Sequence, residues 1–138
     1  MSGEHRSPSM LRRAGAVLAG VVAVVVLSVG TDALLFATGV YPPWGTRMPD
    51  GLFLLATAYR IAYGVAGGYL AARLAPDRPM VHAVWVGALG LAAGLAGVVA
   101  AGTSETDLGP MWYSVAVAAI ALPCVWAGGR LRSRRASP

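Results

Sequence analysis

The chain has 138 residues, of which 57% are hydrophobic and 12% charged, and every one of its 11 basic residues is an arginine, which gives a net charge of +5. Soluble domains usually carry about 25% charged residues, so the composition argues against an ordinary soluble protein. The arginines stand at the ends of apolar runs and form no basic face interleaved with aromatic residues, which argues against a nucleic-acid partner. A single cysteine, Cys124, excludes an intrachain disulfide and a multi-cysteine metal site.

Four apolar runs follow one another along the chain, and each has roughly the 20 residues that a bilayer-spanning helix needs. They predict an all-α, four-helix transmembrane bundle over residues 14–129, between an N-terminal tail at 1–13 and a basic C-terminal tail at 130–138. The four helices are expected at about 14–40, 51–74, 80–102 and 109–129.

The first run also fits a cleaved signal peptide, with Arg12 and Arg13 before the apolar segment "AVLAGVVAVVVL". The apolar character continues through "LLFATGV" without a clean small-residue cleavage site, so we expect a retained helix. Prolines separate the second run from its neighbours: Pro42 and Pro43 lie before it, and Pro76 follows it.

Nine arginines fall on one side of the membrane if all four runs cross it, and cytoplasmic loops are the ones enriched in basic residues. Both termini are therefore predicted to be cytoplasmic. Aromatic residues near both ends of the runs agree with membrane interfaces, Tyr41 and Tyr113 at the outer side and Trp126 at the inner side. The nine arginines are Arg6, Arg12, Arg13, Arg73, Arg78, Arg130, Arg132, Arg134 and Arg135.

Small residues recur along the second and third runs at helical spacing. Lipid tails provide no hydrophobic drive for helix association, so such residues let helix backbones approach closely. They predict either packing within one bundle or a homo-oligomer interface. Pro123 predicts a kink in the fourth helix, beside Cys124 as a small packing residue. The predicted packing glycines are Gly64, Gly68, Gly90, Gly94 and Gly97.

Two ionisable residues lie inside predicted spans. Arg60 is about 13 Å from the outer end of the second helix and Asp32 about 12 Å from that of the first, at about 1.5 Å per residue. The two helices are consecutive and antiparallel, so the charges should lie at similar depth and form an ion pair. Ser28, Tyr59 and Tyr63 are candidate supporting polar residues.

Three interpretations of this pair remain open at the level of sequence. It could be a structural salt bridge that fixes the register of the first hairpin. It could form a polar site in a conduction path or for an anionic headgroup. Finally, Asp32 and Arg60 could fail to meet, with Arg60 reaching toward water.

Other polar residues do not assemble a catalytic or metal-binding motif. His82 begins the third helix, and His5 lies in the N-terminal tail, so no metal-ligand cluster is predicted. Glu105 and Asp107 are interpreted as part of a solvated acidic loop. The chain has no phosphate-binding loop after a strand and no nucleophile elbow. We therefore predict that it is not an enzyme and binds no cofactor.

Four stretches carry a resemblance: "TDALLFATGVYPPWG", "AYRIAYGVAGGYLAARLAP", "PMVHAVWVGALG" and "LGPMWYSVAVAAIALPCVWAGG". Together they resemble a family of small bacterial integral membrane proteins with four predicted spans and no assigned activity. The resemblance covers about residues 31–129. It implies a multi-pass protein of the bacterial inner membrane, and it implies no catalytic residue.

The sequence thus favours a non-enzymatic structural or accessory membrane protein. The alternative is a small oligomeric transporter or channel that uses Asp32 and Arg60. The expected partners are the lipid bilayer and either further copies of the chain or another membrane protein.

Overall fold

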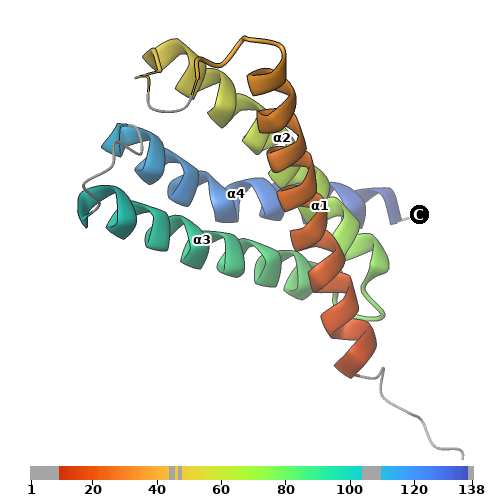
Figure 1. Ribbon diagram of the computed structural model, residues 1–138. Coiled ribbons are helices and arrows are strands. Elements are labelled where there is room, and N and C mark those ends of the chain that lie inside the picture. Colours follow the sequence, from red (N-terminus) through yellow and green to blue (C-terminus); the bar gives the residue numbers. More distant parts are fainter. Residues whose placement is uncertain (1–9, 44–45, 47, 104–109, 137–138) are drawn as a thin grey trace, which may run out of the picture.

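Four antiparallel α-helices make up the described part of the chain, which contains no strand (Figure 1). The computed structural model describes residues 10–43, 46, 48–103 and 110–136. The expected all-α, four-helix architecture is confirmed. The helices are α1 (Met10–Ala37), α2 (Asp50–Leu74), α3 (Pro79–Thr103) and α4 (Met111–Ala136).

The ends of the helices follow local chemistry. After α1, Gly39 takes a positive φ of 79°, which a residue without a Cβ adopts at little cost, and the Tyr41 N–H donates to the Leu35 carbonyl at 3.0 Å. Pro79 opens α3 at a position where a helix needs no N–H donor. α4 continues to Ala136, past the predicted end near residue 129. Arginines suit that last turn because they oppose the negative end of the helix dipole.

α2 is the central helix of the bundle. It contacts α1, α3 and α4, whereas α1 contacts only α2 and α3 among the described helices. Figure 1 shows α3 and α4 running side by side, with α1 crossing them steeply. A small buried cluster joins Ala71 of α2, Val86 of α3 and Val125 of α4, and α1 packs Val17 and Val21 against it.

Three helices of the described chain, α1, α3 and α4, are long and apolar enough to cross a membrane. The sequence predicted four, and α2, which has the same length of 25 residues as α3, falls short in apolar composition. Its hydropathy is lowered by Arg60, three tyrosines and four glycines. A helix with contacts to three neighbours can place such residues against other helices, and Gly64, Gly67 and Gly68 are buried there.

Close helix contacts occur where glycines face a neighbouring helix. A Cβ added at Gly64 would lie 2.9 Å from Cys124 Cβ, and one added at Gly68 would collide with the Val125 backbone, so both positions bring α2 against α4. A Cβ at Gly94 would lie 2.7 Å from Ala118 Cα, where α3 meets α4. At these points only glycine permits the observed approach.

Gly90 and Gly97 differ from these positions. A Cβ at Gly90 would lie at an ordinary 3.4 Å from Ala121 Cβ, whereas nothing lies within 4 Å of one at Gly97. The prediction that Gly97 packs is therefore wrong within the bundle. The half-buried residues Leu91, Gly94 and Val98 define the face of α3 that turns inward, and Gly97 stands beside that face, exposed.

Further close contacts involve glycines of every helix that were not among the predicted packing residues. Gly20 of α1 approaches the Gly67 carbonyl of α2, and a Cβ there would lie 2.8 Å from that oxygen. Gly87 of α3 faces α4, and Gly128 of α4 faces the backbone of α2.

Candidate functional site

A polar cluster joins α1 to α2 in the half of the bundle that holds the α1–α2 connection. Its centre is an ion pair in which Arg60 Nη2 donates to Asp32 Oδ2 at 2.7 Å. Both helices are continuous at these positions, so the two charges are held by ordinary helical backbone. The structure thus brings together the two ionisable residues that the sequence placed inside apolar runs.

Two tyrosines extend the cluster and fix the directions of its hydrogen bonds. The Tyr59 hydroxyl donates to Asp32 Oδ1, while Arg60 Nη1 donates to the Tyr59 oxygen at 3.2 Å. A tyrosine hydroxyl has one proton to give, so the 2.8 Å contact between Tyr41 and Tyr59 requires Tyr41 as the donor. Hydrogen bonds thus run from Tyr41 to Tyr59 and from Tyr59 to the Asp32 carboxylate, and Arg60 binds the other oxygen of that carboxylate.

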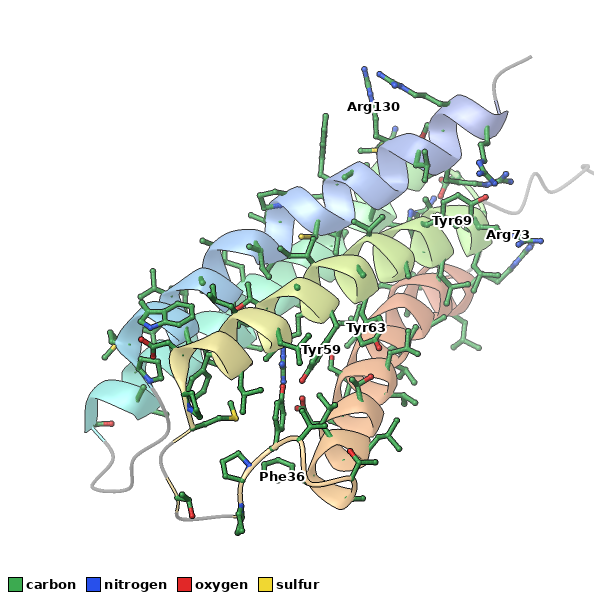
Figure 2. All side chains as sticks on the ribbon, turned by 90° about the horizontal axis from the view of Figure 1, so that it is seen from above. Phe36, Tyr59, Tyr63, Tyr69, Arg73 and Arg130 are labelled. Atoms are coloured by element: carbon green, nitrogen blue, oxygen red, sulfur yellow. The ribbon has the colours of Figure 1, made fainter. Side chains whose placement is uncertain are left out.

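A second hydroxyl pair lies one residue along α1. Thr31 Oγ1 donates to the Leu27 carbonyl at 2.7 Å and is 2.6 Å from the Tyr63 hydroxyl. Because the threonine proton is already given, Tyr63 is the donor in that contact. Figure 2 shows Tyr59 and Tyr63 projecting from α2 toward α1. Both tyrosines therefore bind α1, by hydrogen bonds to consecutive residues.

Aromatic rings connect the cluster to α4. The Arg60 guanidinium carbon lies 5.7 Å from the centre of the Tyr113 ring and 5.2 Å from that of Tyr59. Phe53 of α2 packs on Tyr113 with ring centres 4.9 Å apart, and Trp112 lies beside both rings. A guanidinium within about 6 Å of an aromatic face gains a favourable electrostatic contact. Arg60 is thus held by α1, α2 and α4 together.

The cluster is partly enclosed. Tyr41 is only 4% exposed, whereas the side chains of Arg60 and Asp32 are 22% and 28% exposed. The partners satisfy both carboxylate oxygens and several guanidinium donors, which is the condition under which a buried charge pair is tolerated. Chemically, such an arrangement can hold two helices in register and can present a polar patch at the side of the bundle.

The supporting residues differ in part from those predicted. Tyr59 contacts Asp32 as expected, Tyr63 contacts the neighbouring Thr31, and Ser28 is buried without a hydrogen bond to Asp32. Tyr41 and Tyr113, expected at the outer interface, belong to the cluster. Tyr41 reaches the cluster because the chain turns back over the end of α1 at Gly39, and no spacing along the sequence marks this contact.

A second ion pair joins the opposite end of α1 to the α2–α3 turn. Arg13 Nη2 lies 2.7 Å from Asp77 Oδ2, and the two side chains are 39% and 33% exposed. Arg73 of α2 and Arg130 of α4 lie toward this same end (Figure 2). All described arginines except Arg60 belong to this end, as the antiparallel helix order dictates.

The remaining candidates have packing roles. His82 is buried, and its Nδ1 lies 3.0 Å from the Arg78 carbonyl one turn earlier. Cys124 is buried against Gly64. Within the described residues, no group of three or more histidine, cysteine or acidic side chains could hold a metal ion. His5, Glu105 and Asp107 lie outside the described residues.

Comparison of the chain with protein-family models, with curated proteins and with solved structures gives no match.

Proposed function

We propose that the chain is a multi-pass protein of the bacterial inner membrane, with both termini in the cytoplasm and a non-enzymatic structural or accessory role. The observation that carries the proposal is the distribution of polarity. Large apolar side chains cover the outer faces of α1, α3 and α4, while the ion pair lies between helices and the other described arginines stand at one end.

Helix lengths support a membrane environment. The four helices have 25 to 28 residues, which at about 1.5 Å per residue exceeds the roughly 30 Å of the hydrocarbon core. Exposed side chains such as Leu18, Val22 and Val29 would face water in a soluble protein, at a cost that lipid removes.

The packing of α1 supports α2 as a fourth span. Two contacts tie the helices in antiparallel order, Gly20 to Gly67 and Asp32 to Arg60, and a third joins Arg13 to Asp77 in the turn that follows α2. From Arg13 to Asp32, these contacts cover about 28 Å of α1 at 1.5 Å per residue, which nearly equals the hydrocarbon thickness. Because α2 and the turn after it follow α1 over this distance, we expect α2 to cross the membrane wherever α1 crosses it.

The number of spans has a direct test, because an even number places both termini on one side. Green fluorescent protein and alkaline phosphatase are fused in turn to each terminus of the full chain. Four spans with both termini in the cytoplasm predict fluorescence of the fluorescent protein and an inactive phosphatase at either terminus. Active phosphatase at one terminus would overturn the four-span arrangement, and release of the chain from membranes by alkaline carbonate would overturn membrane integration.

The accessory role is favoured over transport by the tightness of the contacts. At Gly64 and Gly68 the helices α2 and α4 approach so closely that a Cβ would collide, which leaves no room for water between them there. The Asp32–Arg60 pair is also engaged by side chains of the same protein, because Tyr59 donates a hydrogen bond to Asp32 and Tyr41 donates one to Tyr59. Purified protein in liposomes is therefore expected to leave ion and small-solute permeability unchanged. Solute movement that Arg60→Gln abolishes would overturn the accessory role.

One observation favours the second candidate, a small oligomeric transporter or channel. The side chains of Asp32 and Arg60 keep about a quarter of their surface exposed, so a second copy packed beside them could enclose a polar path. Four helices enclose little aqueous volume, and this candidate therefore requires self-association. The same liposome assay, together with the oligomeric state in native-like lipid, separates it from the accessory role.

A further inference from the structure

A shallow hollow lies on the face of α4 that turns away from the bundle, near its C-terminal end. It is lined by Trp126, Ala127, Arg130, Leu131 and Arg134. All five side chains are exposed, whereas Gly128 and Gly129 between them are buried against the other helices. The hollow is therefore separate from the Asp32–Arg60 cluster and from the helix contacts that hold the bundle together.

Two arginines one helical turn apart give the hollow its charge. Residues four apart lie on the same side of a helix, so Arg130 and Arg134 stand one above the other and Trp126 continues the row in the opposite direction. The Arg130 guanidinium carbon lies 5.7 Å from the centre of the Trp126 ring, which holds that side chain along the helix. Ala127 and Leu131 form an apolar strip beside this row.

The arginines of the hollow have no acidic partner within the described residues. The acidic side chain described at this end is Asp77, and it is bound to Arg13. Planar guanidinium groups match the geometry of a phosphate, which accepts two parallel hydrogen bonds from each. Charge complementarity therefore selects an anion, and the adjoining apolar strip selects one that carries hydrocarbon.

The length of α4 places this hollow at the membrane surface. A hydrocarbon core of about 30 Å takes up some 20 residues from Met111, so the core ends close to Arg130. Trp126 then lies about one turn below, at the level where tryptophan side chains are enriched. Arg134 lies about 6 Å above Arg130, among the headgroups.

We propose that this hollow binds one anionic phospholipid of the adjacent leaflet, with Arg130 and Arg134 on the phosphate and Trp126, Ala127 and Leu131 against the glycerol region and an acyl chain. The inference rests on the proposed membrane location, and it adds a specific ligand site to it. An anionic leaflet attracts basic side chains next to a span in general, whereas this site requires two particular arginines.

The test uses purified full-length protein in detergent micelles and counts bound lipid by native mass spectrometry. The protein is titrated with phosphatidylglycerol or with phosphatidylcholine that carries the same acyl chains. We expect one phosphatidylglycerol to bind at least about tenfold more tightly than phosphatidylcholine. The double variant Arg130→Gln/Arg134→Gln should lose that preference. Equal binding of the two lipids to the unaltered protein would overturn the site.

A matched control separates the site from diffuse attraction. Arg132→Gln/Arg135→Gln removes the same charge from the same turns of α4 but leaves the hollow intact, and it should change lipid affinity by less than about threefold. An equal loss in both double variants would overturn the proposal, as would displacement of the lipid by millimolar glycerol phosphate. If the Gln variant folds poorly, Arg130→Lys/Arg134→Lys keeps the charge and should still weaken binding.

These outcomes are distinguishable from a failure of the proposed membrane location. Loss of headgroup preference in a chain that alkaline carbonate leaves in the membrane contradicts the lipid site alone. Extraction of the chain by carbonate contradicts the location, whatever the micelle titration shows.

Discussion

The ion pair between Asp32 and Arg60 makes a quantitative prediction for the stability of the bundle. A hydrogen bond to a charged group contributes about 1.5–3 kcal/mol, and in the proposed membrane location an unpaired charge at this depth costs about 2.5–3.5 kcal/mol. Both side chains keep 22–28% of their surface exposed, which weakens the charge effects. We therefore expect Arg60→Gln and Asp32→Asn each to lower the free energy of unfolding by about 2 kcal/mol.

The double variant Asp32→Asn/Arg60→Gln should lose about 2 kcal/mol rather than 4, since it leaves no unpaired charge. The coupling energy is then about 2 kcal/mol, within the range of about 0.5–3 kcal/mol that contacting pairs show. The assay is detergent-induced unfolding in bicelles, followed by far-ultraviolet circular dichroism. A coupling energy below about 0.5 kcal/mol would refute the reasoning, because the two side chains would then act independently.

A control cycle uses two charges on the same helix that do not meet. Asp50 and Arg73 lie at the two ends of α2, about 35 Å apart at 1.5 Å per residue, and both are exposed. The effects of Asp50→Asn and Arg73→Gln on the free energy of unfolding should be additive.

The Arg60→Gln variant should also show faster amide hydrogen exchange in the half of α1 around Asp32 than in the half that packs on α2 and α3. Uniform acceleration along α1 would contradict a local role for the pair.

Three further predictions follow from the contacts. Gly94→Leu should destabilise the bundle by about 1–3 kcal/mol, because an added Cβ meets α4 backbone at 2.7 Å, while Gly97→Leu should change unfolding by less than about 0.5 kcal/mol, since its surroundings are open. Tyr41→Phe should cost about 1 kcal/mol in the same assay, for one lost hydrogen bond of a buried hydroxyl. Arg13→Gln should cost under about 1 kcal/mol and mainly at low salt, because the side chains of Arg13 and Asp77 are 39% and 33% exposed and water screens their attraction; a large, salt-insensitive loss would contradict this.

Helix number and order could be predicted from the sequence because apolar run length is a strong signal. The encounter of Asp32 with Arg60 also follows from sequence, since equal depth in a short antiparallel hairpin leaves few other partners for either charge. The extension of α4 to Ala136 could not be predicted from hydropathy, because arginines end an apolar run without ending a helix.

The contributions of Tyr41 and Tyr113 required the tertiary structure. Tyr41 reaches the cluster through the turn at Gly39, and Tyr113 reaches it from the fourth helix, so neither position is marked by spacing along the chain.

Gly97 is the opposite case, because its spacing predicted a packing contact that the bundle does not make. Residues three apart and residues four apart both lie on roughly the same side of a helix, so spacing alone does not say which of them touches a neighbour. Gly94 contacts α4, whereas Gly97, three residues later, does not.

The polar residues of α2 and the contacts that hold α1 in place are related, because the same side chains account for both. In the proposed membrane location lipid gives no hydrophobic drive between helices, so α1 needs close backbone contacts or polar bonds to stay in place. Near Gly20 it has both α2 and α3 as neighbours, whereas the described bonds of its far half, from Thr31 and Asp32, reach only α2. The residues that lower the hydropathy of α2, Arg60, Tyr59 and Tyr63, are the ones that bind that half of α1. The helix that composition alone does not mark as a membrane span is therefore the one on which the position of α1 depends.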